Sequence, residues 1–126
     1  MHRSRLGGFI IDCRTEDLDG AAAFWGQALG LKRRLSEAPE DAGYALFERA
    51  GDALEIEVQK VTHESRVHLD IETDNVEAEV ARLVTLGAKV VTRIRDWCVL
   101  EAPTGQKFCV VPAGRPGFAA HANVWP

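Results

Sequence analysis

The sequence lacks long apolar runs and has few cysteines. Its longest apolar stretches hold about five residues, whereas a membrane-spanning helix needs about twenty. The apolar segment at residues 6–11 is too short for the core of an export signal, and Asp12 ends it. Cys13, Cys98 and Cys109 cannot all pair within one chain, so we expect free thiols in a reducing cytoplasm.

The chain also lacks a strong excess of charge of either sign. It has 15 lysines and arginines against 19 aspartates and glutamates, which gives a formal net charge of −4. This mild acidity argues against nucleic acid and against an anionic membrane as partners. With 126 residues, of which 46% are hydrophobic, the chain is predicted to form one globular domain, residues 1–126.

Several motifs of common enzymes are absent. No phosphate-binding loop, nucleophile elbow, CxxC pair or HExxH motif occurs, so P-loop, hydrolase and zincin functions have no support. What the sequence does contain is an internal repeat. Residues 10–19 (IIDCRTEDLD) align with residues 68–77 (HLDIETDNVE) at a constant offset of 58, which is 68 minus 10. In this alignment Asp12 falls on Asp70.

Each copy of the repeat predicts a strand that leads into a capped helix. Asp17 can cap the first helix, and Asp74 is expected to cap the second. Gly30 and Gly87 fit the left-handed positions that end them. Short β-like runs follow at residues 32–35, 44–49 and 53–61, and then at residues 89–93, 97–101 and 108–112.

The predicted fold class is therefore α+β, with two βαβββ modules. They cover about residues 7–61 and 66–112, and an irregular tail, residues 113–126, follows. The helix of such a module covers one face of its sheet and leaves the other face to meet a partner. Two modules that pair about a pseudo-twofold axis would enclose a cleft between their sheets, and such a cleft is a natural site for a small molecule.

Three segments carry a resemblance to a known family. They are DLDGAAAFW at residues 17–25, HLDIETDNV at residues 68–76 and APTGQKF at residues 102–108. In their order and spacing the chain resembles the vicinal oxygen chelate superfamily, which includes glyoxalase I, extradiol dioxygenases, and fosfomycin-resistance and bleomycin-binding proteins. Within it, the chain looks most similar to the broad bacterial glyoxalase-like group.

The resemblance implies a metal site in a paired, curved-sheet domain. Metal-using members hold one divalent ion with residues of the first, fourth, fifth and eighth strands, typically His, Glu, His and Glu. These positions fall on Ile10, Glu55, His68 and Cys109. His68 and Glu55 match the pattern, Cys109 is a softer ligand, and Ile10 cannot ligate. The implied cofactor is a divalent ion such as Zn, Ni, Fe, Mn or Mg.

Strand alternation adds Asp12, Asp70 and Glu57 as candidate catalytic carboxylates. An unpaired carboxylate inside an apolar strand is costly, so both aspartates are either cleft residues or structural partners of an arginine or a backbone amide. Glu57 and Glu55 also fit a solvated strand face. His68 is a ligand, a base or a hydrogen-bonded histidine within the sheet.

Three functions follow from these residues. The first is a metal-dependent, glyoxalase-like lyase, isomerase or dioxygenase, whose ion polarises vicinal oxygens of a small substrate. The second is a metal-free protein of the bleomycin-resistance type that binds or sequesters a small molecule, and the loss of a ligand at Ile10 favours it. The third is a dimeric interaction module, against which the polar residues expected in the cleft speak. We expect a small-molecule partner and a homodimer.

Overall fold

A computed structural model describes all 126 residues of the chain. In chain order the elements are β1 (His2–Arg14), α1 (Leu18–Leu29), β2 (Arg33–Arg34), the 3₁₀ turn η1 (Pro39–Asp41), β3 (Tyr44–Phe47), β4 (Glu55–Val61), β5 (Arg66–Thr73), α2 (Val76–Thr85), β6 (Lys89–Ile94), β7 (Trp97–Glu101), β8 (Lys107–Pro112), α3 (Phe118–His121) and β9 (Asn123–Trp125). The order βαβββ thus occurs twice, which confirms the predicted α+β class. No helix has the length and apolar character that a membrane span requires.

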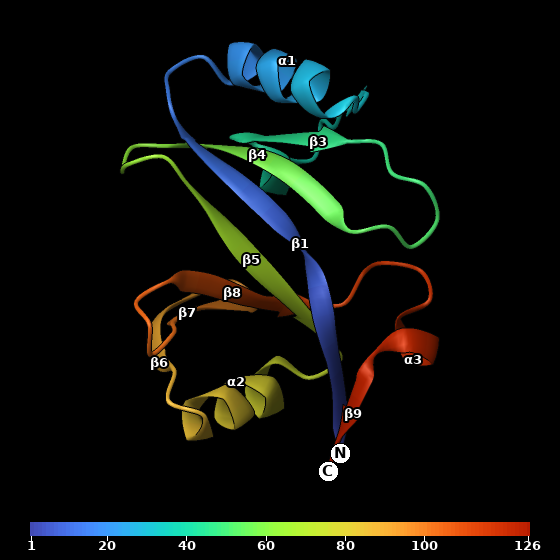
Figure 1. Ribbon diagram of the computed structural model, residues 1–126, viewed down its shortest axis with the longest axis vertical. Coiled ribbons are helices and arrows are strands. Elements are labelled where there is room, and N and C mark those ends of the chain that lie inside the picture. Colours follow the sequence, from blue (N-terminus) through green and yellow to red (C-terminus); the bar gives the residue numbers. More distant parts are fainter. The chain divides into compact units, whose positions relative to one another are not determined.

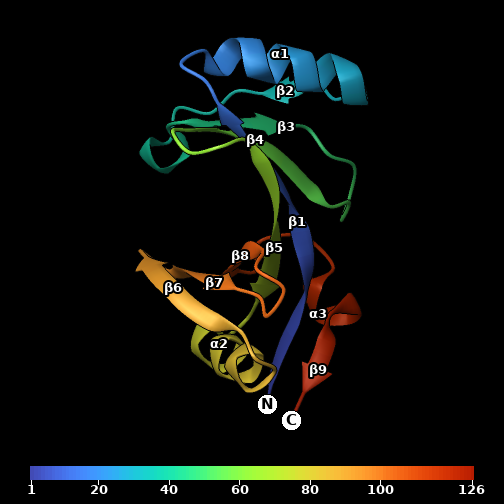
Figure 2. The same ribbon diagram turned by 60° about the vertical axis from the view of Figure 1, so that its left-hand side comes forward.

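The chain divides into two compact units, which we name after their helices. The α1 unit comprises residues 9–67, and the α2 unit comprises residues 1–8 and 68–126. In the α1 unit the strand order is β2-β3-β4-β1, and in the α2 unit it is β1-β5-β8-β7-β6, with β9 on the other side of β1. Each unit has its own helix on one face of its own sheet (Figures 1 and 2).

The core of the α1 unit forms where α1 packs on the sheet. The carboxylate of Asp17 accepts a hydrogen bond from the amide of Gly20 at 2.9 Å and so caps α1 as predicted. Gly30 ends the helix at φ +70°, a conformation that a Cβ disfavours. Between these ends, Ala22 packs into a core with Phe47 and other apolar side chains of the sheet, among them Ile11 and Val58.

The core of the α2 unit is built in the same way, but the helix cap differs from the prediction. Asn75, not Asp74, caps α2 by accepting a hydrogen bond from the amide of Ala78 at 3.0 Å. The predicted cap was wrong because the carboxylate of Asp74 instead accepts a hydrogen bond from the amide of Arg3 at 2.8 Å. The core beneath the helix contains Val80, Leu83, Cys98, Leu100 and Val110.

The C-terminal tail was predicted to be irregular, and this prediction was wrong. Its last strand, β9, pairs antiparallel with the start of β1, so that Trp125 lies opposite His2 and the two chain ends lie together (Figure 1). The indole Nε1 of Trp125 donates a hydrogen bond to Ser4 Oγ at 2.8 Å, and the guanidinium of Arg82 stacks over its ring at 3.9 Å. These contacts order a segment that is rich in proline and glycine.

A fully buried carboxylate lies beside these contacts of Trp125. Glu79 of α2 accepts hydrogen bonds from both Nε and Nη2 of Arg82 at 2.8 Å, and its Oε1 lies 2.8 Å from Nε2 of His2. Burial alone would raise the pKa of Glu79, but hydrogen bonds from Arg82, His2 and Ser4 outweigh it and hold the pKa below its usual range. The carboxylate therefore stays ionised inside the α2 unit.

Candidate functional site

Three side chains with metal-ligand atoms meet on the sheet of the α2 unit. His68 and Asp70 are two residues apart on β5, and Cys109 lies opposite Asp70 in the parallel register of β5 and β8. One donor atom of each side chain lies within 4.8 Å of those of the other two. Ile71 points the other way, into the core under α2, so the cluster lies on the face that α2 does not cover.

This cluster is sheltered and leaves one acceptor unused. The side chain of His68 is 10% exposed and that of Asp70 is 21% exposed, and His68 Nε2 lies 3.5 Å from Asp70 Oδ1. Asp70 Oδ1 is buried and accepts no hydrogen bond. A buried carboxylate oxygen without a donor is costly, and a cation coordinated by it removes that cost. The residues present therefore fit a metal ion.

The structure gathers two of the three predicted metal ligands. His68 and Cys109 belong to the cluster, and Asp70, predicted as a catalytic carboxylate, completes it. Glu55 lies in the α1 unit, where its carboxylate is 2.5 Å from Arg49 Nε and 3.9 Å from Arg34 Nη2. Its negative charge is thus already balanced by guanidinium groups of its own unit.

The remaining predicted carboxylates also lie in the α1 unit. Asp12 is buried in β1, and its Oδ2 is 3.2 Å from Arg66 Nε, so it has the arginine partner that its structural interpretation required. Glu57 is partly buried on β4 and pairs across the ladder with Leu46 of β3. Ile10, at the first-strand ligand position, is buried as an apolar side chain.

Two arginines that the sequence did not single out lie on the same face of β5 as the cluster. Arg5 Nε lies 2.6 Å from Glu72 Oε1, and Arg115 Nε lies 3.3 Å from the same oxygen. Glu72 follows Asp70 by two residues, so strand alternation could place it. Arg5 and Arg115 could not be found in this way, because one precedes the repeat and the other lies in the tail.

The three thiols have different surroundings. Burial raises the pKa of the Cys13 thiol and that of the Cys98 thiol, which keeps both protonated at neutral pH. Cys98 is packed into the core under α2. Of the three, Cys109 is the one that lies among other ligand atoms.

The family profile described as a glyoxalase-like domain matches residues 8–111. The chain belongs to the glyoxalase-like domain family. This confirms the resemblance to the vicinal oxygen chelate superfamily that the three sequence segments indicated. No curated protein matches the sequence.

Solved structures share the fold of this glyoxalase-like domain. A methylmalonyl-CoA epimerase in complex with methylmalonyl-CoA and NH4+ is 19% identical, with a TM-score of 0.59 over 90% of this chain and 98% of that chain. The epimerase from Mycobacterium tuberculosis is 22% identical, with a TM-score of 0.62 over 91% of each chain. A hypothetical protein from Bacillus halodurans C-125 is 14% identical, with a TM-score of 0.63 over 89% of this chain and 96% of that chain.

Proposed function

We propose that this glyoxalase-like domain holds one divalent metal ion with His68, Asp70 and Cys109 and uses the site to bind a small molecule through its oxygen atoms. The observation that carries the proposal is the convergence of an imidazole, a carboxylate and a thiol within 4.8 Å. One oxygen of this carboxylate, Asp70 Oδ1, is buried without a hydrogen-bond donor. The fold supports a small-molecule ligand, because a structural neighbour is solved with methylmalonyl-CoA.

The mixed donor set favours certain ions. One nitrogen, one oxygen and one sulfur ligand suit the borderline ions Zn²⁺, Ni²⁺ and Fe²⁺ better than Mg²⁺, which prefers oxygen ligands alone. Three protein ligands leave a coordination position open, as in catalytic rather than structural zinc sites. When bound, the ion would act as a Lewis acid toward an oxygen of the small molecule.

His68 and Asp70 could also take part in proton transfer. His68 presents Nε2 toward Asp70, and both side chains are largely sheltered from bulk water. In the absence of metal, the same imidazole and carboxylate form a pair that can hold one proton between them, 3.5 Å apart. A lyase or isomerase that moves a proton on an oxygen-bearing substrate fits this arrangement. A homodimer stays a prediction.

A metal-free binding protein is the second candidate function. It is favoured by Ile10, which puts an apolar side chain at the first-strand ligand position, and by Glu55, which is paired with Arg49 and Arg34. Two of the four positions in the usual ligand set of the family, Ile10 and Glu55, are therefore unsuited to a metal. The two candidates make opposite predictions about metal affinity.

Equilibrium dialysis against Zn²⁺, Ni²⁺, Fe²⁺, Mn²⁺ and Mg²⁺, with the bound metal measured by mass spectrometry, separates the two candidates. We expect one bound ion per chain, with an affinity that falls about a hundredfold in His68→Ala because a ligand is lost. The control His121→Ala, at an exposed histidine of α3, binds as the parent does. If no ion is retained at micromolar concentration, the metal-free function holds and the metal site is wrong.

A second pair of variants tests which carboxylate is the ligand. Asp70→Asn is expected to weaken metal binding as strongly as His68→Ala does. Glu55→Gln is expected to leave it unchanged, since that carboxylate is paired with arginines. The reverse result would show that the ligand set implied by the family resemblance is correct and that the geometric cluster is not.

A further inference from the structure

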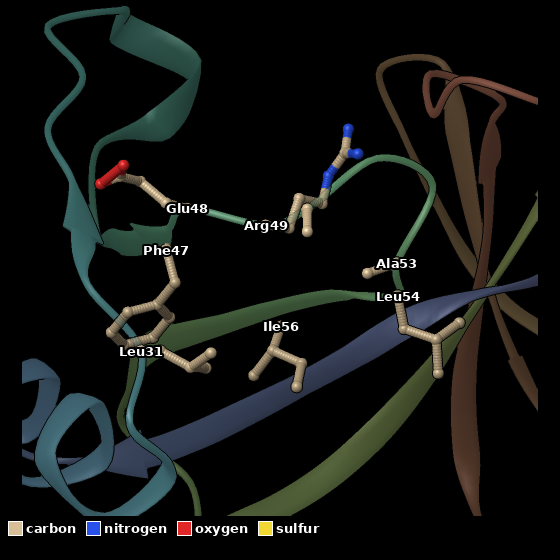
Figure 3. Close-up of a pocket in the computed structure, with 8 residues that line it drawn as sticks. Leu31, Phe47, Glu48, Arg49, Ala53, Leu54 and Ile56 are labelled. Carbon is tan, nitrogen blue, oxygen red and sulfur yellow. The ribbon is translucent and has the colours of Figure 1, made fainter.

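A hollow in the α1 unit uses none of the residues of the proposed metal site. It has a volume of about 340 Å³, and its carbon lining comes from Leu31, Phe47, Ala50, Ala53, Leu54 and Ile56 (Figure 3). Phe47 and Ile56 belong to the core that packs against α1. Because side chains alternate along β4, the hollow lies on the opposite face of that strand from Glu55 and Glu57.

The two charged residues of the lining turn their charges away from the hollow. Arg49 donates hydrogen bonds to Glu55 Oε2 at 2.5 Å and to the carbonyl oxygen of Gly51 at 2.7 Å. Glu48 Oε2 lies 3.8 Å from Lys32 Nζ. Figure 3 shows both charged groups pointing away from Ile56. The inner wall therefore consists mostly of carbon atoms.

The loop that borders the hollow is held in place by its own hydrogen bonds. The amide of Glu48 donates to the carbonyl of Lys32 at 2.8 Å, and the amide of Ala53 donates to the carbonyl of Ala50 at 3.0 Å. Gly51 adopts φ +56°, which permits the turn between them. Since Ala50 and Ala53 contribute only methyl groups, the loop borders the space without filling it. The hollow is thus preformed.

We propose that this hollow binds the uncharged, apolar part of a small molecule, an aryl or alkyl group of about ten carbons. A charged group placed there would lose its hydration without gaining a partner, because the nearby charges are already paired. Size agrees with this class of ligand: a dry cavity of about 150 Å³ takes one benzene ring, and this hollow measures about 340 Å³. Two fused rings therefore fit.

Naphthalene is a suitable probe, and methyl NMR of the full chain follows it. We expect saturable shifts at the methyl groups of Leu31, Leu54 and Ile56. Ala53→Phe directs a ring into the hollow (Figure 3) and should weaken naphthalene binding at least tenfold. The thermal midpoint should stay close to that of the parent, because Ala53 is exposed. The matched control Ala119→Phe, at an exposed alanine of α3, should bind as the parent does.

Two results would overturn the proposal. One is naphthalene binding by Ala53→Phe with the affinity of the parent, which would place the probe elsewhere. The other is a set of Leu54 and Ile56 shifts that change with protein concentration in the absence of probe. That result would show that a second copy of the chain, and not a small molecule, fills the hollow.

Discussion

Asp70 combines features that stability alone would not select. Its Oδ1 is buried without a hydrogen-bond donor, although the residue belongs to a well-formed ladder between β5 and β8. Such groups cluster at functional sites, where a local cost in stability is retained for binding. Asp12 differs in its partner, because its carboxylate lies 3.2 Å from the permanently charged guanidinium of Arg66, whereas the partner of Asp70 is the imidazole of His68 at 3.5 Å.

This contrast predicts opposite effects of two matched substitutions on metal-free protein. Asp70→Asn removes a sheltered carboxylate whose partner is an imidazole and not a guanidinium, and it should leave the free energy of unfolding unchanged or raise it by about 1 kcal/mol. Asp12→Asn breaks an ion pair and should lower it by about 2 kcal/mol. Urea unfolding at about pH 8, where an ordinary histidine is neutral, measures both. Equal losses in the two variants would show that Asp70 is a structural residue.

Glu79 makes the stability of the protein depend on pH. Its pKa is lower in the folded chain than in the unfolded chain, so its contribution is complete above the unfolded pKa, about 4.3, and is lost as the pH falls through the folded pKa. The thermal midpoint of the parent should therefore fall below about pH 4.3. Glu79→Gln should cost about 2–3 kcal/mol at neutral pH and flatten this acid dependence.

The control for Glu79 lies on the same helix. Glu77 is exposed and pairs with Arg93 at 2.6 Å, so Glu77→Gln should change the stability by less than about 1 kcal/mol. Calorimetric scans between about pH 3 and pH 7 compare the two variants. An acid dependence that persists unchanged in Glu79→Gln would show that other carboxylates are responsible for it.

At the scale of elements, β9 is a short strand whose order depends on one side chain. Trp125 bonds to Ser4 and stacks under Arg82, whereas Val124, its neighbour, is half exposed. Trp125→Ala should release β9 and raise the hydrogen-exchange rate of the His2 and Ser4 amides about tenfold or more, since local opening becomes cheaper. Val124→Ala is the control and should leave these rates nearly unchanged. Equal rates in both variants would mean that the backbone pairing alone holds the strand.

The helices show which parts of an element can be inferred from sequence. The apolar spacing and the terminal glycines correctly predicted the positions of both helices, and Asp17 caps α1 as its position predicts. Asp74 has the same local pattern but does not cap α2. Its carboxylate instead accepts a hydrogen bond from the backbone amide of Arg3, a residue far away in the chain. The tail was mispredicted for the same reason: β9 is ordered by a strand edge at the opposite end of the sequence.

For the whole molecule, the internal repeat was the most informative feature. It gave the βαβββ order and placed His68, Asp70 and Glu72 on one face of a strand. It could not reveal that Cys109 lies opposite Asp70, because parallel strands joined through a long connection leave no local sign of their register. Nor could the repeat show that Glu55 forms ion pairs with arginines, since this pairing depends on the course of the loop before β4.

The proposed metal site of His68, Asp70 and Cys109 can be examined through the absorption spectrum of the Co²⁺-loaded protein. A cysteine thiolate bound to Co²⁺ gives a charge-transfer band in the near ultraviolet. We expect this band in the parent and in Cys13→Ser, whose thiol lies outside the cluster, and its loss in Cys109→Ser. A band that survives Cys109→Ser, or Co²⁺ that binds the parent without the band, would show that Cys109 is not a ligand and that the metal is held elsewhere.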